Sequence, residues 1–400
     1  MPLNFKSISR KNMTASPGID TQLAKIYVLR FLFSASNFVM PFATLFVAKY
    51  YDFSSAIQGY VVMGFSASYL IGSLMGGYLG DKISTRPLLI SLASVLLGSM
   101  LASTFLATPL LNVVALTMST LAAGASVPVL NTYIAAVVDR SAQQSVFGNL
   151  YLTYNLAIAF VYIAGGFMLD KNAGFALELF TFMACLTVLA TLTLNGSRAI
   201  KDASGSASTS PSIRIPTLVI LGFCLFAGLA VLDAQRSYLL PKWLDAINAT
   251  SAAKTFGILG IVNACTVLVA TKPLISYVKK FSPITNMAIA AIFYGIGFGG
   301  YFFVHDLPAM CILVVVWTAG EILGATYMNV IIAENVPGAI RSRVFSIIPS
   351  LLTVGKIIAI EFAQVMINTA GVTRSWIFYN TIAILIFFGA VYVRRSLIVK

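Results

Sequence analysis

Six ionisable side chains interrupt long apolar stretches of this sequence. A charged group at the centre of a membrane helix costs about 2.5 kcal/mol or more, so such residues usually have a functional or a pairing role. In sequence order they are Arg30, Asp233, Arg236, Glu321, Lys356 and Glu361. The carboxylic acids among them could alternate between a protonated and a charged form, which is the chemistry that proton coupling requires.

Spacing indicates which of these groups could neutralise one another. Asp233 and Arg236 are three residues apart, so they share a helix face and can form an ion pair. Glu321 and Lys356 should both lie near mid-membrane on consecutive helices and could also form a pair. The alternative for each pair is a structural clamp that only holds helices together. Arg30 has no evident partner at its depth, so it either snorkels inward or faces a central cavity, and we expect the cavity.

The remaining chemistry-bearing residues do not form a recognisable site. The four cysteines lie inside apolar runs without a CxxC pair, and the single histidine, His305, lies in a short turn. This pattern favours neither a disulfide framework nor a zinc or haem site. The sequence also lacks a nucleotide-binding loop and a nucleophile paired with a base. We therefore expect no cofactor, no metal and no enzyme activity.

The amino-acid composition distinguishes a membrane protein from a soluble one. The chain has 400 residues, of which 58% are hydrophobic and only 10% are charged, whereas soluble domains carry about 25% charged residues. The formal charge of +13 is spread over short gaps between apolar runs, without a basic stripe that would indicate nucleic-acid binding. The chain is therefore expected to lie in a lipid bilayer as an all-α membrane protein.

The apolar runs divide into twelve candidate membrane helices. Each needs about twenty residues to cross a hydrocarbon core of about 30 Å. The predicted spans run from 24 to 48, 57 to 79, 87 to 107, 109 to 137, 146 to 169, 174 to 195, 216 to 240, 254 to 277, 284 to 304, 309 to 333, 344 to 367 and 373 to 393.

The distribution of Lys and Arg among the connecting segments predicts the orientation of the chain. Most of these residues lie in the two end segments and in the loops on one side of the membrane. Basic segments tend to stay in the cytoplasm, so both ends of the chain are expected there, in a cytoplasmic (inner) membrane. The opposite side holds only Lys49, Lys171, Lys242, Lys254 and Arg374.

The longest gap between spans divides the chain into two similar parts. It contains a Ser- and Gly-rich stretch typical of a flexible linker. The sequence after Asp139 is also similar to the sequence after Glu334, as in a duplicated six-helix unit. The predicted divisions are a tail at 1–23, a six-helix bundle at 24–195, a linker at 196–215, a second bundle at 216–393 and a tail at 394–400.

A charged turn, GYLGDKISTRP, lies between the second and third spans. An acid at a helix end can cap neighbouring helix N-termini and pair with a cation. The turn resembles the loop signature of the major facilitator superfamily, although Ser84 and Thr85 replace a second Gly and an Arg. The resemblance implies that fold of twelve helices in two bundles, with the acid as a latch on the cytoplasmic side. The matching residues are Gly77, Asp81, Lys82 and Arg86.

Three further acids are similar in placement to those of the drug:proton antiporter branch, particularly the LmrP-like multidrug antiporters. They are Asp139 after the fourth span, Asp233 in the seventh and Glu321 in the tenth. The resemblance implies that these residues carry the coupling protons. The chain departs from the branch at Thr120, where relatives often have Arg, and in the fifth span, which keeps only Gly165-Gly166 of a longer motif.

The expected function is secondary active transport by alternating access, in the form of proton-coupled efflux of amphipathic small molecules or drugs. The alternative is a dedicated carrier, exporter or importer, of one polar or anionic metabolite, with Arg30, Arg236 and Lys356 binding the anionic group. Glu361 is a further candidate for a charge pair or for the wall of the substrate cavity. The expected partners are a small-molecule substrate, protons and the lipid bilayer, with no nucleic acid, and the expected state is a monomer.

Overall fold

The computed structural model describes residues 17–80, 82–106, 108–138, 140–194, 215–248, 250–336, 344 and 347–398. Within these ranges every regular element is a helix. The first part of the chain forms α1 (Pro17–Ala35), α2 (Val39–Tyr50), α3 (Ser55–Gly80), α4 (Thr85–Phe105), α5 (Pro109–Val137), α6 (Arg140–Lys171) and α7 (Ala173–Leu192). The second part forms α8 (Thr217–Asp233), η2 (Ala234–Ser237), α9 (Leu239–Asn248), α10 (Ala252–Val278), α11 (Pro283–Gly299), η3 (Gly300–Phe302), α12 (Leu307–Asn335), α14 (Ile347–Ala370) and α15 (Ser375–Ile398).

The number of membrane spans predicted from the sequence is confirmed. Twelve helical segments of the described chain are long and apolar enough to cross a membrane. In lipid, a helix satisfies its own backbone hydrogen bonds, and this explains why such apolar runs all become helices. The seventh span, Thr217–Asn248, is longer than the predicted 216–240 because α9 continues it.

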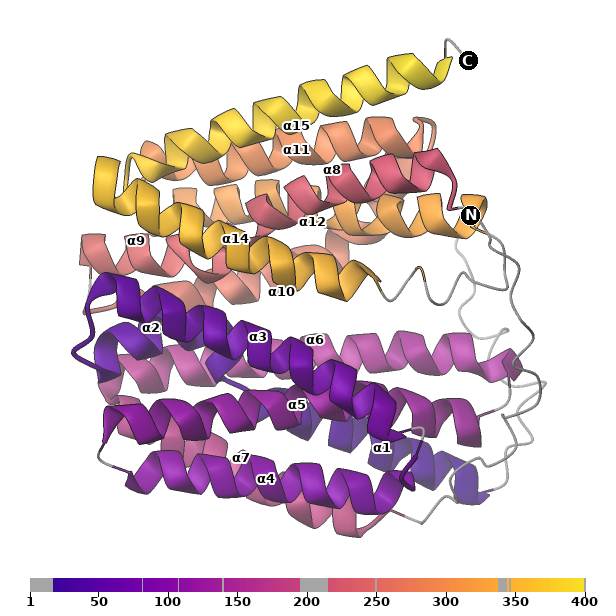
Figure 1. Cartoon of the computed structure of the whole chain (residues 1–400), viewed down its shortest axis with the longest axis vertical. Helices are drawn as coiled ribbons and strands as arrows, with labels where there is room; N and C mark the ends of the chain where they lie inside the picture. Colours follow the sequence, from indigo (N-terminus) through magenta and orange to yellow (C-terminus); the bar gives the residue numbers. More distant parts are fainter. Residues whose placement is uncertain are drawn as a thin grey trace.

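The helices form two groups in chain order. Figure 1 shows α1–α7 in the lower part of the view and α8–α15 in the upper part. We call these groups the N-terminal half and the C-terminal half. The predicted linker at 196–215 falls almost entirely outside the described residues, so the division at those positions stays a prediction.

Two of the spans are interrupted near corresponding prolines. The first span breaks between α1 and α2, and the seventh breaks at η2 between α8 and α9. Pro41 and Pro241 are each the third residue of the helix that follows the break. Because proline has no N–H and its ring clashes with the carbonyl four residues earlier, these prolines disfavour a regular helix through Asn37 and Ser237. The breaks expose backbone and polar side chains in the middle of the bundle.

Glycines allow α3 and α5 to pack with their backbones in contact. A Cβ atom at Gly72 would collide with the carbonyl oxygen of Leu121, and one at Gly76 would collide with that of Ala125. Gly124 of α5 meets the backbone of Tyr69 in the same way. Close approach through small residues is a common means of helix association in membranes, where no hydrophobic force drives helices together.

Substitution of Gly72 by Ala should therefore destabilise the protein. Overpacking of this kind costs about 1–3 kcal/mol, because the two backbones must separate. The measurement is thermal unfolding in detergent, followed by circular dichroism. Gly64→Ala, on the same helix with nothing within 4 Å of its added Cβ, is the matched control and should leave the midpoint unchanged. Equal midpoints for the two variants would show that the backbone contact does not limit stability.

Candidate functional site

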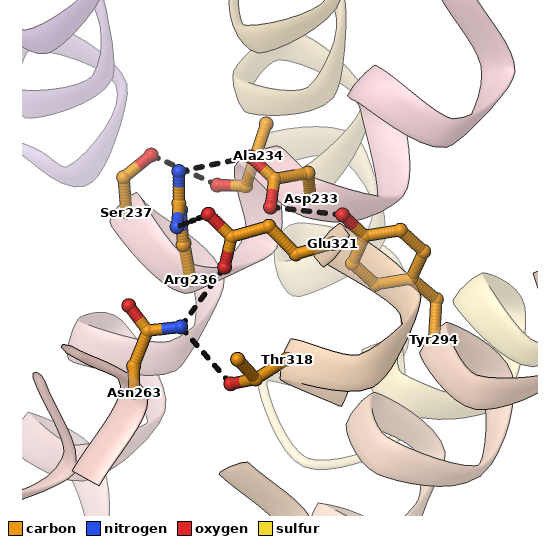
Figure 2. Close-up of polar contacts among 8 residues, drawn as sticks. All are labelled: Asp233, Ala234, Arg236, Ser237, Asn263, Tyr294, Thr318 and Glu321. Atoms are coloured by element: carbon orange, nitrogen blue, oxygen red, sulfur yellow. Dashed lines mark hydrogen bonds and ion pairs between the residues drawn. The ribbon is translucent and has the colours of Figure 1, made fainter. Parts of the chain in front are cut away.

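Three of the predicted ionisable residues meet at the break in the seventh span. Arg236 of η2 donates from Nη1 to Glu321 Oε1 of α12 at 2.8 Å, and its Nη2 lies 3.2 Å from Asp233 Oδ2 at the end of α8. Figure 2 shows the guanidinium held between the two carboxyl groups. We call Asp233, Arg236 and Glu321 the acid–arginine cluster.

Neutral donors hold the second oxygen of each carboxylate. Asn263 of α10 donates from Nδ2 to Glu321 Oε2 at 2.9 Å and to Thr318 Oγ1 at 2.9 Å. The Tyr294 hydroxyl of α11 donates to Asp233 Oδ1 at 3.1 Å. Both carboxylates are thus oriented from two sides, with helices α8, α10, α11 and α12 contributing to one network (Figure 2). The predicted ion pair between Asp233 and Arg236 is confirmed.

The helix break explains how one arginine reaches two acids. Asp233 is the last residue of α8, where the helix dipole is negative and disfavours a carboxylate. The 3-10 turn that follows places Arg236 next to that helix end, so the guanidinium compensates both the carboxylate and the dipole. The side chains of Arg236 and Glu321 remain 33% and 25% exposed, so water can reach the cluster.

The predicted pair between Glu321 and Lys356 is wrong. Glu321 pairs with Arg236, which the break in the seventh span turns toward α12. Lys356 of α14 lies within electrostatic range of Arg236 and Asp233, but it forms no ion pair within the described part of the chain. The cluster itself therefore contains two carboxylates for one guanidinium.

Arg30 lies apart from the cluster, in the N-terminal half. Its guanidinium carbon is 5.0 Å from the centre of the Tyr154 ring, and Tyr69 lies nearby. Such a contact stabilises a cation by about 0.5–2 kcal/mol without neutralising it. A hollow of about 110 Å³ opens beside these rings, and the buried Asn37 Oδ1 in its wall has no hydrogen-bond partner among the described residues. Arg30 itself does not line this hollow, so its orientation toward a central cavity stays a prediction.

The structure does not bring the other candidate acids to this site. Glu361 is exposed on α14 and forms no ion pair among the described residues, so neither role predicted for it is supported by a contact. Asp139 and Asp81 lie outside the described residues, and their roles stay predictions.

The rest of the charged turn is visible beside Asp81. Lys82 donates to the Tyr78 hydroxyl, and Arg86 donates to the Leu192 carbonyl at 3.2 Å. Gly77 is half-buried, with open space where a Cβ would lie. These contacts all lie within the N-terminal half. The role of Asp81 as a latch that holds the cytoplasmic side closed therefore stays a prediction.

The two halves are joined at one end by Asp170, a residue that the sequence analysis did not single out. Asp170, at the end of α6, accepts hydrogen bonds from the backbone N–H groups of Ala253 at 3.1 Å and Lys254 at 2.7 Å. It also pairs with Lys49 at 2.6 Å. A carboxylate from one half thus caps the N-terminus of α10 in the other half, where the helix dipole favours a negative charge.

Further contacts close the same end. Thr44 donates to the Ser237 carbonyl at 2.8 Å, which is free because Pro241 cannot bond to it. Lys242 donates to the Gln58 side chain across the halves. Next to the Asp170 cap, Gly166 and Gly257 let α6 and α10 touch.

Next to these contacts, aromatic rings from both halves fill the space between the two halves. Phe42, Tyr162 and Phe256 pack edge to face, with ring centres 5.4–5.9 Å apart. All these contacts lie at the end that the charge distribution predicts to be external. The acid–arginine cluster lines a hollow of about 110 Å³ together with Phe226, Asn329 and Ile348, which lie toward the opposite ends of α8, α12 and α14. The charge distribution predicts that those ends are cytoplasmic, so the arrangement is expected to be inward-facing.

Comparison with known proteins gives the context for this geometry. A model of the Major Facilitator Superfamily matches residues 26–360. The chain is 22% identical over 358 residues to a Na(+), Li(+), K(+)/H(+) antiporter of Planococcus maritimus, covering 80% of this chain and 83% of the relative. It is 20% identical over 329 residues to the uncharacterized MFS-type transporter YqjV of Bacillus subtilis (strain 168), covering 78% of each.

Solved structures share the fold at low sequence identity. A POT family transporter in complex with 5-aminolevulinic acid superposes with a TM-score of 0.78 at 14% identity, covering 94% of this chain and 96% of the other. A mutant form of the nucleoside transporter NupG superposes with a TM-score of 0.73 at 14% identity, covering 94% of this chain and 99% of the other.

The Asp170 cap should hold the predicted external end closed. Asp170→Ala removes a cap that joins the halves, which should cost the closed arrangement about 1–2 kcal/mol and shift the population about five- to thirtyfold toward opening. Spin labels at Ser54 and Thr250, exposed at this end of opposite halves, report the distance by electron paramagnetic resonance.

Asp306→Ala is the matched control for this experiment. Asp306 caps α12 through Ala309 N–H at the same end, but entirely within the C-terminal half. Its substitution should leave the distance distribution unchanged. A distribution in Asp170→Ala identical to that of the parent protein would contradict the role of this cap in closure.

Proposed function

The chain belongs to the Major Facilitator Superfamily, and from this premise we propose that it is a proton-coupled antiporter that exports amphipathic small molecules. The family makes it a secondary transporter, and twelve apolar helices make it an integral membrane protein. In the proposed cycle, protons enter as substrate leaves, with the acid–arginine cluster as the coupling site. The protein would act in the inner membrane as a monomer with both termini in the cytoplasm.

The observation that carries this proposal is the pair of carboxylates on one guanidinium. One negative charge is enough to neutralise Arg236, so the second carboxylate can accept a proton while the ion pair persists. Burial favours the neutral form of a carboxylic acid, whereas the nearby cation favours the charged form. The partly exposed site gives the proton a path from water. The cluster can therefore load and release a proton without leaving an isolated charge in the membrane.

Antiport follows if substrate and proton alternate at this site. When both carboxylates are charged, the three residues of the cluster carry one excess negative charge, which Lys356 offsets in part from within electrostatic range of Asp233. The charge that remains at the carboxylates attracts a cationic or strongly dipolar group. Tyr162, from the opposite half, lies within electrostatic range of Arg236 and Glu321, so the cluster borders the aromatic contact between the halves. Binding of a proton removes the excess charge and releases such a substrate. The cation/H(+) antiporter among the relatives is consistent with this exchange.

The alternative, a carrier of one anionic metabolite, rests on the cations that have no acid partner. Arg30 and Lys356 form no ion pair among the described residues, so they could bind an anion. Arg236 is less suited to this role than the sequence suggested, because two carboxylates already occupy its guanidinium. Uptake of ethidium into inverted vesicles with an imposed pH gradient would favour the antiporter, and uptake restricted to a single anion would favour the carrier.

Glu321→Gln should uncouple transport from the proton gradient. The amide keeps the hydrogen-bonding shape of a protonated carboxyl but cannot lose a proton, so gradient-driven accumulation of ethidium in inverted vesicles should be lost. Exchange of labelled for unlabelled ethidium needs no net proton movement, and it should persist at least partly. Asp233→Asn should have the same effect, because Arg236 contacts both acids in the structure.

Glu361→Gln is the matched control, since it removes an intramembrane acid that lies outside the cluster. It should retain gradient-driven accumulation. If Glu321 instead served only to clamp Arg236, Glu321→Gln would lower the thermal stability of the protein. The triple variant Asp233→Asn, Arg236→Met and Glu321→Gln removes all three charges together and leaves none without a partner. It would then restore both stability and gradient-driven transport, and this recovery would refute the coupling role.

A further inference from the structure

A groove runs along the outer face of the C-terminal half, between α11 and α15. It encloses about 690 Å³ and is lined almost wholly by apolar side chains. Ile292 and Ile296 of α11 and Ile384 and Phe388 of α15 are exposed along it. The acid–arginine cluster does not contribute to this groove, so it is separate from the proposed transport site.

Small residues create the groove. Gly295 approaches α15 so closely that a Cβ would lie 3.0 Å from the Ala383 Cβ, and Asn380 occupies the space beside Gly299. The two helices therefore cross in contact, and no large side chain covers the crossing. The result is a hollow of about 690 Å³ on the outer face of the two helices.

The groove continues toward a basic end. A second hollow, of about 390 Å³, lies between the start of α11 and the end of α15, and Phe387 lines both hollows. Arg394 and Arg395 line this second hollow together with Thr285. Both arginines are exposed and form no ion pair within the described part of the chain.

The net charge at this end of the groove stays positive when its other charged residues are included. Glu334 shares a neighbouring hollow with Arg394, so it offsets part of one charge. Lys279 and Lys280, at the end of α10, add positive charge on the same side of the membrane. The charge distribution of the loops predicts that this side is cytoplasmic.

We propose that this groove binds an anionic phospholipid, with its phosphate group at Arg394 and Arg395 and an acyl chain along α11. The groove matches that ligand in charge and in length. From Thr285 to Gly299, α11 rises about 21 Å, which exceeds the half-thickness of a hydrocarbon core of about 30 Å. Basic pockets between helices at the cytoplasmic surface are typical sites for anionic headgroups, whereas a zwitterionic lipid has no net charge to offer them.

Native mass spectrometry of the purified protein tests this proposal. The protein is released from micelles that contain equal amounts of phosphatidylglycerol and phosphatidylcholine, and the retained lipid is counted. The parent protein should retain phosphatidylglycerol in preference to phosphatidylcholine. Arg394→Gln combined with Arg395→Gln should reduce that retention about tenfold, because each basic residue near the surface contributes to the attraction.

Two further variants make the result specific. Lys279→Gln combined with Lys280→Gln removes the same charge from the same side but outside the groove, and it should retain the lipid as the parent does. Arg394→Lys combined with Arg395→Lys keeps the charge and should also retain it. Equal retention of the two lipids by the parent protein, or equal loss in the Lys279/Lys280 variant, would overturn the proposal. The comparison of lipids on the parent protein does not depend on the folding of any variant.

Discussion

The structure depends on how a charge is neutralised inside a membrane bundle. Arg236 lies in the middle of the seventh span, and two carboxylates from different helices contact it directly. An ion pair that loses one partner leaves a buried charge, which is costly in a low-dielectric interior. With two carboxylates at one guanidinium, one carboxylate can be protonated while the other stays paired with Arg236. No buried charge is then left without a partner. The cluster is thus the place where four helices meet, and we propose that a proton enters there without disrupting them.

Two helix breaks make this arrangement possible, and both are related to proline. Pro241 interrupts the seventh span, which turns Arg236 toward α12 and frees the Ser237 carbonyl. That carbonyl accepts the hydrogen bond from Thr44, beside the break in the first span that precedes Pro41. The proposed coupling site and the contact between the halves therefore share one backbone feature. A change at the cluster has a direct structural route to the closed end.

The twelve spans and the local pair of Asp233 with Arg236 could be predicted from the sequence, because apolar run length and spacing along one helix determine them. The partner of Glu321 could not, since Arg236 is distant in sequence and its direction depends on the helix break. The matching positions of Pro41 and Pro241 were the available signal for that break. Asp170 was missed for a different reason. Its carboxylate accepts hydrogen bonds from backbone N–H groups of the other half. Because every residue except proline has such a group, the amino-acid sequence does not indicate this contact.

We propose that the protonation state of the acid–arginine cluster decides which end of the protein is closed. The most direct test is the distance between spin labels at Ser54 and Thr250, measured in acidic and in neutral buffer. The parent protein should show a pH-dependent shift between closed and open distances at the predicted external end. The double variant Asp233→Asn with Glu321→Gln should show one distribution at both pH values. A pH response in the double variant equal to that of the parent would show that groups outside the cluster control the closure.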